Sequence, residues 1–159
     1  MKIVQFIVVL LLFLNSCNRE KLFSRKLMKG ETWYVESITI NDENLDINGE
    51  WYVNRDVDIY DSVPQIIWKS RFIDTNYILQ TADAVFQWQF QEKGKKFYIN
   101  YQQQCTECNG SDLDTLDYLT FNLTGSYDVV KHKRKEMIFT SSSLAAYPGK
   151  EVEIQLTRK

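Results

Sequence analysis

The stretch Val85-Phe-Gln-Trp-Gln-Phe-Gln91 decides the fold, because aromatic and amide side chains alternate along it without a break. Successive side chains of an extended chain point to opposite faces, so Phe86, Trp88 and Phe90 share one face and the glutamines share the other. A turn that contains glycine follows, and residues 96–102 alternate again. Two such segments around a short turn predict an antiparallel β-hairpin with one aromatic face.

The rest of the chain repeats this pattern of short extended segments, with its glycines before or between them. Further strands are expected at 33–40, 50–54, 66–73, 77–82, 118–123, 127–132, 136–141 and 152–157. No apolar pattern of helical period and helical length is found after residue 30. About eight strands paired in chain order predict an all-β domain over residues 30–159, an antiparallel up-and-down β-barrel, because closure removes exposed sheet edges.

The N-terminus has the composition of a secretory signal. Met1-Lys2 gives a cationic start, and an apolar run over 3–14 follows. This run is shorter than the roughly 20 apolar residues of a membrane-spanning helix, so we expect a signal peptide over residues 1–16. The ending Leu14-Asn-Ser-Cys17 resembles a bacterial lipobox, which implies that Cys17 is acylated, with diacylglycerol and palmitate, and becomes the N-terminus of a lipoprotein. The alternative is a plain signal peptide whose cysteine is incidental.

Residues 17–29 are expected to form a tether between this anchor and the barrel. Five cations against one acid lie in residues 18–29. We favour a solvated tether with one or two helical turns; the alternative is a basic strip against anionic headgroups, where each cation contributes about 1 kcal/mol. In enteric lipoproteins an aspartate after the modified cysteine implies retention in the inner membrane. Asn18 stands there instead, so we expect a lipid anchor in the outer membrane of the cell envelope.

Cys105 and Cys108 form the remaining cysteine pair. In an exported protein such a pair is most simply a disulfide. A redox role needs the pair at a helix N-terminus, whereas this pair lies in a turn-rich stretch with Glu107, whose charge would raise a thiol pKa. Zinc would need further ligands, and the chain has one histidine and no other free cysteine if Cys17 is acylated. We expect a structural disulfide, with a reduced or metal-bound pair as the alternatives.

Charge and motifs narrow the classes of function. Cleavage before Cys17 leaves 143 of the 159 residues, with 18 of the 19 basic and all 21 acidic side chains, a balance that argues against nucleic-acid binding. The only histidine, His132, lies among cations and is interpreted as a solvated turn residue. Ser141-Ser-Ser143 lacks the glycines of a nucleophile elbow. In the acidic stretch 107–117 the glycine precedes the aspartates, which is the wrong order for an EF-hand calcium loop. We expect no enzyme, no cofactor and no metal site.

Two further segments carry a resemblance to a known family. The domain starts with Leu27-Met-Lys-Gly-Glu-Thr-Trp33 and closes with a strand and a charged tail, Glu151-Val-Glu-Ile-Gln-Leu-Thr-Arg-Lys159. Together with the meander between them, these segments resemble the small lipocalin-like lipoproteins of the Bacteroidetes. Lipocalins open their first strand with Gly-x-Trp, where this chain has Gly30-x-x-Trp33. The resemblance implies an eight-stranded antiparallel barrel with a central cavity.

The function depends on what fills the barrel. An eight-stranded barrel is just wide enough to be filled by its own side chains or to hold one small ligand. Phe86, Trp88 and Phe90 are candidates for lining a ligand cavity, and the alternative is that their rings fill the core. We expect a lipid-anchored binding module for a small apolar or amphipathic ligand. The alternative function is a structural or interaction subunit of an envelope protein assembly.

Overall fold

The structure is a computed structural model that describes residues 19–30, 32–45, 47, 49–53, 64–73, 79–101 and 115–158. Its elements in chain order are α2 (Arg19–Lys29), β1 (Thr32–Ile40), β2 (Glu43–Asn44), β3 (Gly49–Val53), β4 (Gln65–Ile73), β5 (Leu79–Gln91), η1 (Glu92–Gly94), β6 (Lys96–Asn100), α3 (Thr115–Asn122), β7 (Gly125–His132), β8 (Glu136–Ser141) and β9 (Val152–Thr157).

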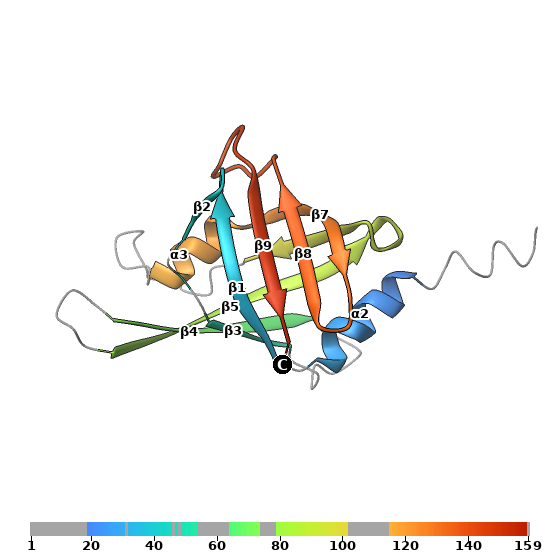
Figure 1. Cartoon of the computed structure of the whole chain (residues 1–159), viewed down its shortest axis with the longest axis horizontal. Coiled ribbons are helices and arrows are strands. Elements are labelled where there is room, and N and C mark those ends of the chain that lie inside the picture. Colours follow the sequence, from blue (N-terminus) through green and yellow to red (C-terminus); the bar gives the residue numbers. More distant parts are fainter. Residues whose placement is uncertain are drawn as a thin grey trace, which may run out of the picture.

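The strands close into a barrel (Figure 1). Nine strands form one antiparallel sheet in which β1 pairs with β3, each strand from β3 to β8 pairs with the next, and β9 pairs back with β1. The two-residue strand β2 only extends the edge of β1, so eight strands make the barrel wall. The antiparallel up-and-down barrel expected from the sequence is confirmed.

The hairpin that decides the fold has the expected pairing. Phe90 lies opposite Phe97 across β5 and β6, and the single turn of 3-10 helix η1 joins the two strands. One expected boundary is wrong, because the strands predicted at 77–82 and 85–91 are not two separate strands. Residues 79–91 form one long strand, whose first part pairs with β4 without interruption.

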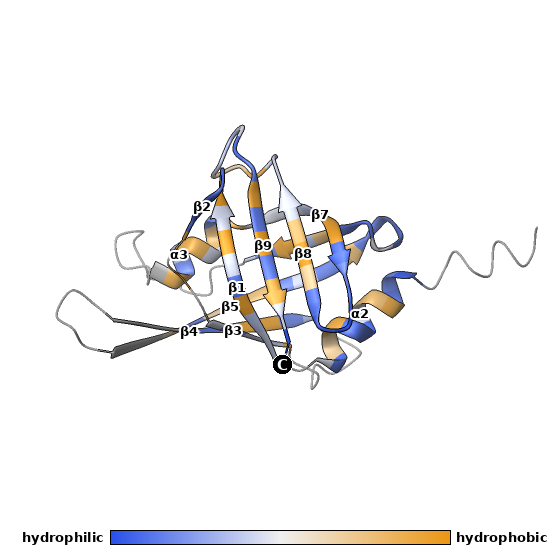
Figure 2. Ribbon diagram, in the orientation of Figure 1, coloured by the Kyte–Doolittle hydropathy of each residue, from blue (hydrophilic) through white to orange (hydrophobic). Residues whose placement is uncertain are grey.

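Alternation along the strands fills the barrel interior with large apolar side chains. On β5 the inward residues Ala84, Phe86, Trp88 and Phe90 are all at most 6% exposed. Figure 2 shows the same alternation of apolar and polar residues along β9. The largest side chains that are fully buried are Trp33, Trp51, Trp68, Trp88, Tyr127, Phe86, Phe97 and Phe139.

The segment 118–123, expected as a strand, is instead the end of the helix α3 and the turn residue after it. Leu116, Leu119 and Leu123 are buried, and their spacing of three and four residues places them on one helical face. The hydroxyl of Thr120 donates to the carbonyl of Leu116 at 2.7 Å, one helical turn back. An apolar run this short fits a strand and a helix equally well; only Leu116, outside the expected strand, reveals the helical period.

Two hydrogen bonds hold the residues that follow the C-terminal end of α3. The Tyr127 hydroxyl of β7 donates to the carbonyl of Leu123 at 2.6 Å. After β6, the backbone N–H of Tyr101 donates to the hydroxyl oxygen of Thr124 at 3.2 Å. Burial, followed by a hydrogen bond to the Asp117 carboxylate and its charge, raises the pKa of Tyr101 to about 12. Burial also raises the pKa of Tyr127, so both hydroxyls stay neutral at physiological pH.

The segment before the barrel, expected as a solvated tether with one or two helical turns, is the helix α2, and it packs on the barrel instead of being solvated. Leu27 is fully buried, and its carbonyl accepts a hydrogen bond from the indole nitrogen of Trp33 at 2.9 Å. The Arg158 guanidinium lies 5.9 Å from the Trp33 ring centroid. Burial of Leu27 and Phe23 explains why this segment docks despite its charge. No helix in the described part of the chain is both long and apolar enough to span a bilayer.

The two helices lie at opposite ends of the barrel, since β7 runs from one to the other (Figure 1). β7 begins at Gly125, just after α3. It ends at His132, whose ring stacks on Phe23 of α2 with centroids 3.8 Å apart. α2 also packs against β5 and η1, and α3 packs against β5.

Candidate functional site

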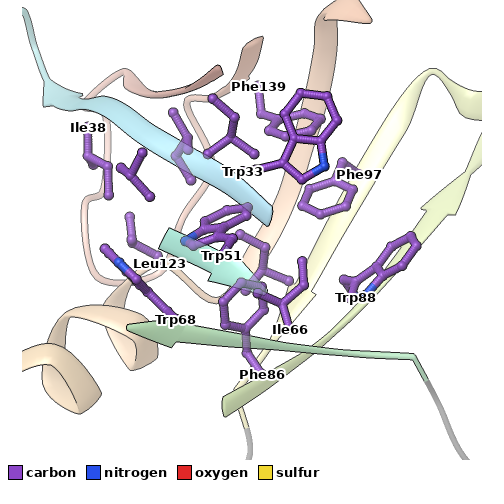
Figure 3. Close-up of a cluster of buried hydrophobic side chains, with 14 of the residues drawn as sticks. Trp33, Ile38, Trp51, Ile66, Trp68, Phe86, Trp88, Phe97, Leu123 and Phe139 are labelled. Atoms are coloured by element: carbon purple, nitrogen blue, oxygen red, sulfur yellow. The ribbon is translucent and has the colours of Figure 1, made fainter. Parts of the chain in front are cut away.

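Tryptophans from three adjacent strands line one side of the barrel interior. Trp33 of β1 lies opposite Trp51 of β3, and Trp51 lies opposite Trp68 of β4. The rings of Trp51 and Trp68 meet edge to face with centroids 6.1 Å apart. Phe86 meets Trp51 at 5.0 Å. Figure 3 shows Trp51, Trp68 and Phe86 close together, with Leu123, the residue after α3, near Trp68. Trp51, Trp68 and Phe86 form an aromatic group on the α3 side of the interior, whereas Trp33 lies toward α2, where its indole nitrogen donates to the carbonyl of Leu27.

A second aromatic group lies toward α2. Phe90 lies 5.1 Å from Phe97 and 6.0 Å from Trp88, and Phe97 stacks on Phe139 at 4.3 Å. Phe86, Trp88 and Phe90 therefore all point inward and are buried, but they divide between two groups: Phe86 contacts Trp51, while the other two contact Phe97. Their role in lining a ligand site stays a prediction.

Most polar groups in this interior have local partners. The Ser141 hydroxyl donates to the carbonyl of Ser126 at 2.7 Å. The Tyr127 and Thr120 hydroxyls and the Trp33 indole also donate to backbone carbonyls. This is the usual state of buried polar atoms, because an unmet donor loses its hydration without compensation.

Three indole nitrogens depart from this rule. Those of Trp51, Trp68 and Trp88 are buried and donate to no acceptor among the residues that the structure describes. Each side chain is at most 1% exposed. An indole nitrogen can only donate, and each unmet donor costs about 1–3 kcal/mol. Two of these donors belong to the adjacent Trp51 and Trp68 rings, so this part of the interior suits an oxygen acceptor surrounded by aromatic rings.

Gly49 allows Trp68 to lie where it does. Its φ of +147° lies in a range that favours glycine, and a Cβ there would lie 2.8 Å from the Trp68 indole nitrogen and 2.4 Å from the carbonyl oxygen of Lys69. Sequence reasoning missed the roles of Trp51 and Trp68. The sequence signal for an inward position was present in both strands, because Trp51 alternates with Val53, and Ile66 with Trp68. These two strands were expected to form part of the barrel, but their inward side chains were not considered as part of a site.

His132 is not the solvated turn residue that was expected. Its ring is half-buried between Phe23 and Phe90, and neither ring nitrogen has a well-formed hydrogen bond within the described residues. Burial, followed by the positive charge of Lys26, lowers the pKa of His132 to about 4, although backbone carbonyls of Phe23 and His132 itself oppose this slightly. The ring therefore packs as a neutral aromatic, which explains its place beneath a cationic helix.

Three residues named as sites in the sequence lie outside the described residues. These are Cys17, the expected lipidation site, and the expected disulfide partners Cys105 and Cys108. Their roles stay predictions.

Comparison with known proteins supports the fold. The sequence matches no protein-family model and no curated protein. Among solved structures the chain is similar to Japanin from Rhipicephalus appendiculatus bound to cholesterol, with a TM-score of 0.53 and 9% sequence identity, over 82% of this chain and 76% of that one. A likeness at this identity establishes the fold alone. The fold is lipocalin-like.

Proposed function

We propose that this protein is a binding module whose barrel interior holds a small amphipathic molecule. The observation that carries the proposal is a set of buried indole donors in an aromatic interior, at Trp51, Trp68 and Trp88, that find no acceptor among the described residues. The fold adds support, because lipocalin-like barrels are typically binding proteins, and the similar barrel of Japanin is bound to cholesterol. This reading also agrees with the expectation that the chain is not an enzyme.

Two features of the interior define the ligand's chemistry. Aromatic rings offer apolar surface and edge-to-face contacts to a hydrocarbon or ring body. The Trp51 and Trp68 nitrogens offer donors to a hydroxyl, carbonyl or carboxylate oxygen. Since a net hydrogen bond contributes about 0.5–1.5 kcal/mol, each donor should strengthen binding about two- to tenfold over a hydrocarbon of the same size.

The test is a titration of paired probes, a long-chain alcohol and the alkane of equal length, followed by tryptophan fluorescence. A chain that starts at residue 18 is suitable, since α2 and all barrel strands lie within residues 19–157. We expect the alcohol to bind more tightly than the alkane. Trp51→Phe and Trp68→Phe keep a ring and remove a donor, so each should weaken binding of the alcohol alone.

The outcomes of this titration separate the two parts of the proposal. If neither probe binds, the binding function is wrong. If alcohol and alkane bind equally, and the two phenylalanine variants change nothing, the interior binds ligands but the indole donors do not select them.

The same proposal includes a lipid anchor at Cys17 in the outer membrane, in a lipoprotein of the Bacteroidetes type. Its support is the signal-like run 3–14 and the lipobox-like ending. Cys17→Ala should abolish fatty-acid labelling and release the protein from the membrane fraction. Unchanged labelling in that variant would refute the assignment.

One observation favours the alternative function as an interaction subunit of an envelope assembly. Tyr118 and Phe121, one helical turn apart on the outer side of α3, are 57% and 55% exposed. Aromatic side chains are enriched at protein interfaces. Cross-linking in intact cells with wild type and a Tyr118→Ser/Phe121→Ser variant tests this role. A partner captured by the wild type and lost in the variant supports it; equal capture by both contradicts it.

A further inference from the structure

The α2 end of the barrel collects most of the protein's positive charge. Residues 19–29, 92–95, 131–136 and Arg158 together hold twelve of the 19 cations and only three of the 21 carboxylates. That leaves seven cations and eighteen carboxylates for the rest of the chain. A molecule of net charge −2 therefore has one strongly basic end, which we call the basic end and define by these residues.

The outer face of α2 is a stripe of cations. Lys21, Arg25 and Lys29 recur every four residues, so they share one face of the helix, and all three are exposed. Phe23 and Leu27 lie on the opposite face, toward the barrel. The three stripe cations form no ion pair with any described residue. Like charges at this spacing destabilise a helix slightly, so the stripe is better suited to a surface that supplies negative charge.

Two neighbouring turns extend the stripe into a broad surface. The Glu20 carboxylate accepts a hydrogen bond from the backbone N–H of Lys93 at 2.5 Å, which joins α2 to η1. The stack of Phe23 on His132 joins α2 to the β7–β8 turn. In that turn residues 133–135 are three consecutive exposed cations. Figure 2 shows this turn as a polar segment beside α2.

We propose that the basic end lies against an anionic lipid bilayer. Charge complementarity is the first argument, because clustered basic residues on an amphipathic helix suit acidic headgroups. The second is Leu22, which is 50% exposed beside the stripe and can enter the boundary between headgroups and acyl chains. The third is position and rests on the proposed function: the proposed lipid anchor, Cys17, lies two residues before the start of α2 in the sequence. In this orientation the α3 end of the barrel points away from the bilayer.

The experiment measures sedimentation of the chain from residue 18 with vesicles of phosphatidylcholine, alone or mixed with phosphatidylglycerol. A cation near an anionic leaflet changes the partition coefficient about fivefold. The double variant Lys21→Gln/Arg25→Gln should therefore bind mixed vesicles about 25-fold more weakly. The matched control Lys69→Gln/Lys150→Gln also removes two cations and so has the same net charge as the test variant. Its substitutions lie outside the basic end, so it should bind as the wild type does.

Several results would overturn the proposal. Equal binding to both kinds of vesicle would exclude recognition of anionic lipid. Equal loss in the two double variants would show that net charge, not the basic end, determines binding. Displacement from the vesicles by duplex DNA at equal charge concentration would identify a general polyanion site. Thermal unfolding of both variants serves as the folding control. Both should unfold near the wild-type temperature: in α2 glutamine is about as good a helix former as lysine or arginine, and Lys69 and Lys150 are exposed.

Discussion

Replacing His132 with phenylalanine should remove a specific part of the protein's sensitivity to acid. In the folded protein the imidazole stacks on Phe23 at 3.8 Å and meets Phe90 edge to face at 5.5 Å. Burial and the nearby Lys26 charge lower its pKa from 6.5 to about 4. The unfolded chain therefore binds this proton more readily than the folded protein does. The stability that the neutral His132 ring contributes is therefore fully present above about pH 6.5 and is lost as the pH falls to about 4.

The size of this effect follows from the shift. At 1.36 kcal/mol per pKa unit, the free energy of unfolding that acid can remove through His132 is at most about 3 kcal/mol. The ring is only half-buried, so solvent screening reduces the expected loss to about 1–2 kcal/mol between pH 7 and pH 4.

Urea denaturation of the wild type and His132→Phe at a series of pH values measures this loss. Phenylalanine preserves the ring contacts and cannot be protonated, while every carboxylate titrates in both proteins and cancels in the difference. We expect the wild type to lose about 1–2 kcal/mol more than the variant between pH 7 and pH 4. Parallel curves for the two proteins would refute the burial of a neutral histidine against α2.

Three further predictions concern packing, backbone and cysteines. Leu27→Ala should lower the free energy of unfolding, measured by urea denaturation, by about 2–5 kcal/mol, as for buried leucines elsewhere. The control Leu22→Ala should change it by less than about 0.5 kcal/mol. Similar small effects for both variants would show that α2 is not docked. Gly49→Ala should lower stability by more than about 3 kcal/mol, because strain at positive φ adds to a clash with the Lys69 carbonyl and the Trp68 indole. The control Gly149→Ala, in open space at φ +70°, should cost about 1 kcal/mol. Equal losses would contradict the close approach of Trp68 and Lys69 to Gly49. Peptide mapping without reduction should find the two cysteines of segment 105–108 joined, and alkylation of both would disprove the disulfide.

The barrel was predictable because its signal is local and repeated. Alternation in 85–91 and 96–100 states which face is buried, and glycines separate the strands. Any closed antiparallel arrangement that buries those faces satisfies the same pattern, so the architecture follows without knowledge of individual contacts. The positions that face inward, Phe86, Trp88 and Phe90 among them, follow from the same period of two.

The helix α3 and the docking of α2 on the barrel were missed for different physical reasons. The segment containing α3 is short, and its apolar residues at 119 and 123 are compatible with either period until Leu116 is included. The α2 segment is dominated by cations, which suggested a solvated tether. Its docking depends on Phe23 and Leu27 meeting Trp33, Phe90 and His132, which are contacts between residues far apart in sequence.

The candidate site was predictable only in part. An aromatic interior follows from the strand pattern. The absence of acceptors for Trp51 and Trp68, within the described part of the chain, depends on the three-dimensional arrangement of the other polar groups, since Trp33 finds a carbonyl and those two do not.

Native mass spectrometry of the chain purified from its own cells tests the central claim most directly. We predict a mass increment from one oxygen-containing small molecule, released on unfolding and reduced in a Trp51→Phe/Trp68→Phe variant of intact fold. A protein whose native mass equals its denatured mass, and stays so after incubation with long-chain alcohols, would contradict the account.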